Sequence, residues 1–153
     1  MKPAGKSAHE SLYFDYPHFE PPTGPARDTL RDPVTVAIIG AGPVGLTAAL
    51  ALAQEGVRSV LFDDKASFND GSRAICLSRA SFHIFQALGI VGAFEGKALG
   101  WTTGRSFYRG RQILEFDMPD SPSERFRPMY NLQQQYIEQF LHDAVAANPL
   151  IET

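Results

Sequence analysis

Hydrophobic residues fall into two patterns along the chain, and regular patterning begins abruptly at Val34. The run 34–39 is continuously apolar and rich in β-branched residues, which is typical of a strand covered on both faces. In the next segment, 43–55, apolar residues recur three and four positions apart, as on one face of a helix: Leu46, Ala49, Leu50 and Ala53. A second strand is predicted over 58–62, where the apolar residues begin at Val60. These segments predict a strand–helix–strand unit with parallel strands and a right-handed crossover.

Weaker patterns predict further elements downstream. Ser78 can cap a helix over 79–88, the segment 105–118 resembles a hairpin that turns at 109–111, and apolar spacing predicts a helix over 133–147. A third strand begins near Leu150. These elements form an incomplete α/β sheet with a hairpin insertion, so we expect the 153 residues to be the first part of a longer protein.

The first 33 residues are different in character. They contain six prolines and no sustained periodicity, which predicts an extended or disordered leader. The aromatic side chains of the stretch "SLYFDYPHF" can hold part of this leader against a surface. We therefore divide the chain into a leader, 1–33, and a domain portion, 34–153.

Composition excludes several classes of protein. The net charge of −3 gives no basis for binding nucleic acid, and no apolar run approaches the roughly 20 residues that span a bilayer. The chain has a single cysteine, Cys76, so it can form no internal disulfide, which suits a cytoplasmic protein. We interpret Cys76 as a small buried hydrophobe. The four histidines lack metal-ligand spacing, so we expect no metal site.

Glycines stand at three positions between the first strand and the first helix, in the spacing G-x-G-x-x-G: Gly40, Gly42 and Gly45. The first permits a tight turn, the second lets a pyrophosphate approach the backbone, and the third lets the helix pack closely on the strand. The N–H groups at the helix start and the positive end of its dipole then face the phosphates.

An acid follows the second strand at the position expected for a dinucleotide site. Asp63 lies 18 residues after Gly45, where a carboxylate accepts hydrogen bonds from the adenosine ribose. Together with Asp64 it would repel a 2′-phosphate, so NADP is disfavoured here. The turn, helix, strand and acid predict dinucleotide binding, but they do not distinguish FAD from NAD.

Three blocks of sequence resemble the FAD-dependent aromatic-ring hydroxylases, the single-component flavoprotein monooxygenases of the para-hydroxybenzoate hydroxylase type. They are "GAGPVGLTAALALAQEGV", "GSRAICLSRASFHIFQALGI" and "YNLQQQYIEQFL", in the family's order and near its spacing. The resemblance covers residues 34–150 and is greatest for the 3-(3-hydroxyphenyl)propionate hydroxylase branch. It implies a Rossmann-like FAD-binding domain of the glutathione-reductase type.

The resemblance also implies roles for individual residues. The three glycines would hold the FAD pyrophosphate with Pro43 and Val44 lining the turn, and Asp63 would bind the adenosine ribose. Arg73 matches an arginine that reaches back to the FAD, and Gln134 matches a glutamine on the flavin side. The family implies NAD(P)H as a transient electron donor, with a small aromatic substrate and O₂ as reactants, and no side chain is assigned a catalytic role.

The sequence also departs from the family. The ribose acid is often Glu in these enzymes and is Asp63 here, while the family's later Asp-Gly and Gly-Asp motifs have no counterpart in the 153 residues. One alternative is therefore a noncatalytic fragment that binds FAD weakly or not at all. Another is an NAD-binding dehydrogenase domain, which the "RAICLS" and "NLQQQYIEQFL" blocks disfavour.

Overall fold

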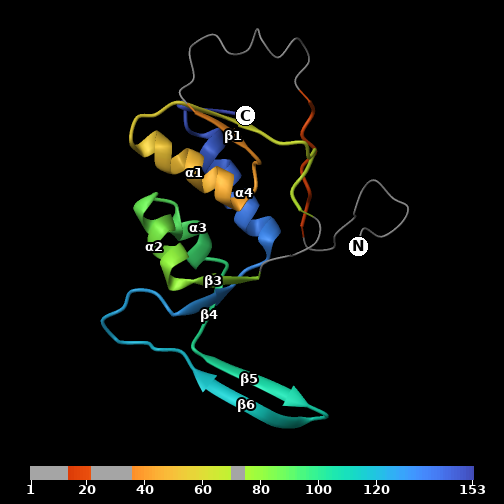
Figure 1. Cartoon of the computed structure of the whole chain (residues 1–153), viewed down its shortest axis with the longest axis vertical. Coiled ribbons are helices and arrows are strands. Elements are labelled where there is room, and N and C mark those ends of the chain that lie inside the picture. Colours follow the sequence, from red (N-terminus) through yellow and green to blue (C-terminus); the bar gives the residue numbers. More distant parts are fainter. Residues whose placement is uncertain (1–13, 22–35, 70–74) are drawn as a thin grey trace, which may run out of the picture. The chain divides into compact units, whose positions relative to one another are not determined.

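The computed structural model describes residues 14–21, 36–69 and 75–153. The described residues form two compact units, one drawn from 1–72 and 141–153 and the other from 73–140. Figure 1 shows the elements of both in chain order. None of the helices in these described ranges is long and apolar enough to cross a bilayer.

The first unit is built on a parallel three-stranded sheet in the order β1-β2-β8. Val36 pairs with Ser59, and Ser59 pairs in turn with Ile151. The predicted strand–helix–strand unit and the opening of a third parallel strand are thus confirmed. The elements are β1 (Val36–Ile39), α1 (Pro43–Gln54), β2 (Ser59–Phe62) and β8 (Ile151–Glu152).

Helix α1 buries the face that its periodicity predicts. The buried residues are Leu46, Ala49, Leu50 and Ala53. Pro43 occupies the first turn, where its missing N–H is not needed, and Gly56 follows the helix with a φ of 74°. The helix packs against β1, β2 and β8.

Strand β1 differs from its prediction, because only one of its faces is covered by described residues. Ile38 faces α1, since its Cγ2 atom lies 3.3 Å from the place where a Cβ on Gly45 would be. Ala37 and Ile39 point the other way and are exposed. Side chains alternate between the two faces of a strand, so a single helix can bury only half of them.

The second unit contains an antiparallel sheet in the order β3-β7-β4. Its strands have three residues each, too few for a periodic pattern to reveal, and the sequence did not predict them. The strands are β3 (Cys76–Ser78), β4 (Leu99–Trp101) and β7 (Met129–Asn131). The helices are α2 (Arg79–Ala87), the unpredicted α3 (Val91–Glu95) and the first part of α4 (Gln134–Ala146).

Aromatic rings form the core of this unit. Phe82 stacks on Tyr130 with ring centroids 3.7 Å apart, and Phe85 stacks on Phe94 at 4.0 Å. Ser78 caps α2 as predicted, since its side chain accepts a hydrogen bond from the N–H of Ser81. Burial of large rings with this geometry stabilises the unit beyond its buried area.

A charged cluster lies on the second unit. Asp120 accepts hydrogen bonds from Arg79 at 2.6 Å and from Arg127 at 3.0 Å. Partial burial raises the pKa of Asp120, but hydrogen bonding and the two guanidinium charges outweigh it. The pKa of this carboxyl therefore lies below its usual value of 3.8.

The predicted hairpin is confirmed, with a turn one residue shorter than expected. Strands β5 (Thr103–Tyr108) and β6 (Arg111–Asp117) pair antiparallel around Arg109 and Gly110, whose φ angles are 48° and 77°. Positive φ at both turn residues matches the twist of the two strands.

The interpretation of Cys76 as a buried hydrophobe is wrong. The cysteine is exposed on β3, and its thiol lies 3.4 Å from the side-chain oxygen of Asn131. Strand β3 is at an edge of its sheet, where less of each side chain is covered.

Candidate functional site

The backbone turn between β1 and α1 has a conformation that depends on glycine. Gly40 has a φ of 105°, which L side chains rarely adopt, and its N–H donates to the carbonyl of Phe62 at 2.7 Å. Gly42 follows at the N-cap of α1 in an extended conformation. A Cβ on either residue would meet no atom within 4 Å. The space over the turn is therefore open to a ligand.

Gly45 has the opposite surroundings. A Cβ at this position would overlap the carbonyl oxygen of Gly40 and lie 3.2 Å from its carbon. Helix α1 can therefore approach β1 this closely only with glycine at this position. The division of roles expected from the spacing agrees with this geometry, with two open glycines facing outward and one packed glycine holding the helix against the strand.

Asp63 lies directly beside the turn. Its Oδ2 atom accepts a hydrogen bond from the N–H of Ala41 at 2.6 Å, and its Oδ1 atom accepts one from the N–H of Lys65 at 2.9 Å. The residue is exposed, so lone pairs on both oxygens can also accept from a ligand. Two residues 22 positions apart thus place a carboxylate next to the helix N-terminus.

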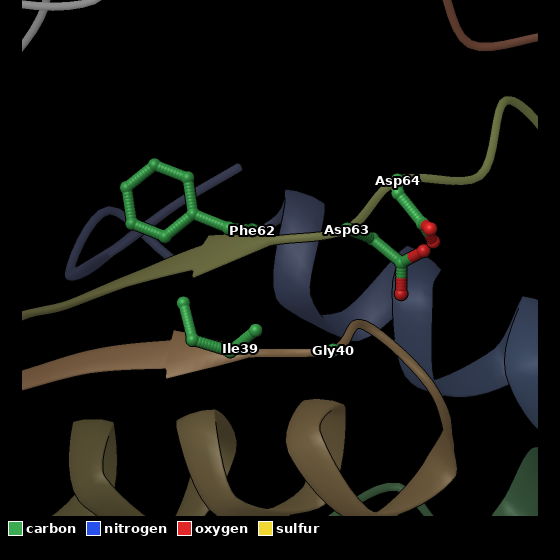
Figure 2. A pocket seen from close by; sticks show the side chains of 5 residues that line it. All are labelled: Ile39, Gly40, Phe62, Asp63 and Asp64. Atoms are coloured by element: carbon green, nitrogen blue, oxygen red, sulfur yellow. The ribbon is translucent and has the colours of Figure 1, made fainter.

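A pocket of about 490 Å³ opens at the carboxyl ends of β1 and β2. Figure 2 shows Ile39 and Phe62 beside each other at the strand ends, and the carboxylate of Asp63 near the turn at Gly40. Asp64 completes the lining. The pocket combines an apolar wall, exposed backbone and carboxylates, at the end of a parallel sheet where ligands of such folds bind.

The start of α1 suits phosphate. Its first turn holds no acidic side chain, and its N-cap has no side chain that bonds the free N–H groups. Those N–H groups and the helix dipole favour an anion. Pro43 lies in the first turn, and Val44 is 85 % exposed beside it, as residues that line the turn must be. The residues present therefore fit the ADP half of a dinucleotide.

The two remaining predicted residues, Arg73 and Gln134, are not tested by the geometry of this turn. Arg73 lies outside the described residues. Gln134 belongs to the second unit, where its side chain is buried and its Nε2 atom donates to Oε1 of Glu138 at 2.7 Å. Its contact with a flavin stays a prediction.

Two residues with a part in the site at the turn were not predicted. Ala41 and Lys65 contribute through their backbone N–H groups, which a sequence pattern does not reveal. In the second unit, Glu138 is 2 % exposed and accepts a hydrogen bond from the amide of Gln134, and it was not predicted either. The only signal for Glu138 was its position, four residues after Gln134 on one helix face. Among the described residues, no cluster of His, Cys, Asp and Glu could hold a metal ion.

Comparisons with known sequences agree with this geometry. The family described as FAD binding domain matches residues 33–153. The 3-(3-hydroxy-phenyl)propionate/3-hydroxycinnamic acid hydroxylase of Mycobacterium sp. strain JLS is 32 % identical over 130 residues, covering 84 % of this chain and 22 % of that protein. The chain thus spans about a fifth of the length of this curated relative.

Solved structures that resemble this chain are also flavin-dependent or related monooxygenases. The flavin-dependent monooxygenase PieE, solved in complex with FAD and substrate, matches 78 % of this chain and 23 % of its own with 30 % identity and a TM-score of 0.66. The p-nitrophenol 4-monooxygenase PnpA of Pseudomonas putida DLL-E4, at 21 % identity and a TM-score of 0.68, covers 78 % of this chain and 31 % of its own and shares the fold. Together with the glycine turn and its acid, these matches show that the chain belongs to the FAD binding domain family and is similar to flavin-dependent monooxygenases.

Proposed function

We propose that the chain is the FAD-binding portion of an NAD(P)H-dependent monooxygenase that hydroxylates a phenolic or related aromatic substrate. The observation that carries the proposal is the bond between Asp63 and the N–H of Ala41, which holds a carboxylate beside an open glycine turn. The family match over residues 33–153 identifies the dinucleotide as FAD.

The residues of the chain would bind and orient FAD. The N–H groups at the start of α1 would receive the pyrophosphate over Gly42, and Asp63 would accept hydrogen bonds from the ribose hydroxyls. The carboxylates of Asp63 and Asp64 would repel a 2′-phosphate at the ribose. When bound, FAD supplies the redox chemistry, and the protein contributes position and electrostatics.

The substrate class rests on relatives. The Mycobacterium relative is named for 3-(3-hydroxy-phenyl)propionate and 3-hydroxycinnamic acid, both phenols with an acidic side chain. We propose a substrate of this class, with O₂ as the second reactant and NAD(P)H as the electron donor. We also propose a cytoplasmic location, which the lone cysteine suits.

A noncatalytic role for the isolated 153 residues is the second candidate. Exposed apolar side chains on the described strands favour it, including Ile39 at 82 % and Ile113 at 65 % exposure. In this case the chain binds the ADP half of FAD weakly and performs no turnover alone.

One experiment separates these candidates. The chain is mixed with FAD, desalted and examined by visible absorption. In a second protein, a chimera, residues 34–153 of this chain replace the matching segment within the Mycobacterium hydroxylase. Retained flavin and phenol-stimulated NAD(P)H oxidation by the chimera support the full proposal. Flavin retained only by the chimera supports the second candidate, and a folded chimera without flavin contradicts both.

A further inference from the structure

A short N-terminal segment, residues 14–21, lies against the loop that follows Asp63. We call it the strap; it has no helix or strand, and it precedes the family match, which begins at residue 33. Phe14 is nevertheless only 7 % exposed. Figure 1 shows the strap, in red, running beside the chain that leaves β2. Burial of a large ring shows that the strap packs against other residues of its unit.

The strap is attached to the loop over 64–69 by a backbone bond and by rings. The N–H of Phe19 donates to the carbonyl of Ala66 at 2.8 Å. The ring of Phe68 lies edge-on to the ring of Phe19, with centroids 5.4 Å apart. The centroids of Phe68 and Phe14 are 6.3 Å apart. Such edge-to-face pairs stabilise the arrangement beyond their buried area.

The end of α4 completes the aromatic cluster. The ring of His142 lies 4.8 Å from that of Phe19 and 5.6 Å from that of Phe68. All of these residues belong to the first unit. The strap therefore joins the loop to α4, a helix whose conformation is fixed by its own regular hydrogen bonding.

This loop supplies one of the two backbone hydrogen bonds that the carboxylate of Asp63 accepts. Oδ1 of Asp63 accepts from the N–H of Lys65, and Ala66, which bonds the strap, is the next residue. The loop has no helix or strand, and Asp64, Lys65 and Ala66 are all exposed. Among the described residues, the bonds of this loop include those of Asp63, the bond from Nζ of Lys65 to Oδ1 of Asn69 at 3.2 Å, and the bond that the strap supplies.

We propose that the strap is a positioning element for the ribose-binding carboxylate, with Phe19 as its central residue. Phe19 fixes Ala66 and Phe68, the fixed loop presents the N–H of Lys65, and that N–H orients Asp63 toward the adenosine ribose. The inference rests on the proposed function, because it assumes that Asp63 binds a ribose. It adds a positioning residue that lies outside the matched family domain.

The test uses the 153-residue chain with three substitutions. Phe19→Ala removes the ring, and Phe19→Tyr keeps it. Phe107→Ala serves as a matched control, because it removes a ring that is 62 % exposed on the hairpin of the other unit. The first readout is hydrogen exchange of the Lys65 amide in the ligand-free chain. We expect exchange to rise up to about tenfold in Phe19→Ala and to stay unchanged in the other two.

The second readout is the affinity of each chain for ADP and for 2′-deoxy-ADP, measured by NMR titration. The wild-type chain is expected to prefer ADP because Asp63 bonds the ribose hydroxyls. In Phe19→Ala this preference is expected to shrink by about three- to tenfold, while Phe19→Tyr and Phe107→Ala keep it. A merely structural loss would weaken both nucleotides equally and leave the ratio unchanged.

Three results overturn the inference. Unchanged exchange at Lys65 would mean that the strap does not hold the loop. Faster exchange with an unchanged ADP preference would mean that the loop does not orient Asp63. A folded wild-type chain that binds neither FAD nor ADP would contradict the proposed function itself, and the inference with it.

Discussion

Gly45→Ala places one methyl group where the helix and the strand leave no room. The new Cβ would overlap the carbonyl oxygen of Gly40 and lie 3.3 Å from Cγ2 of Ile38. Overpacking typically costs about 1–3 kcal/mol, and the upper end applies because the obstacle is backbone that cannot rotate away. Alanine regains at most about 1 kcal/mol through its helix propensity. We expect a net loss of about 2 kcal/mol or more in the free energy of unfolding.

The assay is urea unfolding followed by circular dichroism, with two matched glycine substitutions. Gly92→Ala lies in α3 with no atom within 4 Å of the added Cβ, so its stability is expected to equal that of the wild type or exceed it by up to about 1 kcal/mol. Gly42→Ala also meets no atom within 4 Å and costs at most about 1 kcal/mol as an N-cap. Its Cβ would occupy the space proposed for the pyrophosphate, so we expect FAD affinity to be lost while the fold is kept.

If Gly45→Ala unfolds within about 0.5 kcal/mol of the wild type and binds FAD equally well, α1 does not pack on β1 as described. If Gly42→Ala retains full FAD affinity in a folded chain, the space over the turn is not the phosphate site.

Three further substitutions test other parts of the account. Asp63→Asn keeps an acceptor for the N–H of Ala41 but loses the negative charge, so a fluorescence titration should show about tenfold weaker FAD binding. Unchanged FAD affinity would remove Asp63 from the site. Glu138→Ala deletes the acceptor of the buried Gln134 amide and should lower the free energy of unfolding by about 1–3 kcal/mol, with Glu138→Gln closer to wild type; equal losses would show that this bond contributes nothing. Asp120 has a folded-state pKa below its unfolded value of 3.8, so its contribution to stability is present above pH 3.8 and is lost as the pH falls through the lower value. The stability difference between wild type and Asp120→Asn should therefore shrink in acid unfolding below pH 3.8, and a constant difference would contradict the assigned pairing.

The first unit was predictable because the hydrophobic patterns of its helix and strands extend over several residues and agree with one another. The apolar stripe of α1 and the apolar strands on either side have different periods, and Gly56 marks the end of the helix. Asp63 could be identified because it follows directly after β2. Its bond to Ala41 could not, since backbone N–H groups have no sequence signature.

The second unit was less predictable for physical reasons. A three-residue strand such as β7 shows no usable alternation, and its pairing with β3 and β4 is fixed by tertiary contacts. The five-residue α3 is equally short. The strap illustrates a different difficulty. Its prolines and lack of periodicity indicate a leader, and its aromatic side chains predict attachment to a surface, but no sequence signal identifies the loop at Ala66 as that surface.

Binding of FAD at the turn between β1 and α1 is the central claim, and an anisotropy titration of FAD with the chain tests it most directly. We predict that FAD anisotropy rises with added wild-type chain, that ADP reverses the rise, and that Gly42→Ala produces none. A folded wild-type chain that leaves the anisotropy unchanged, or a Gly42→Ala chain that binds FAD as well as the wild type, would contradict the account.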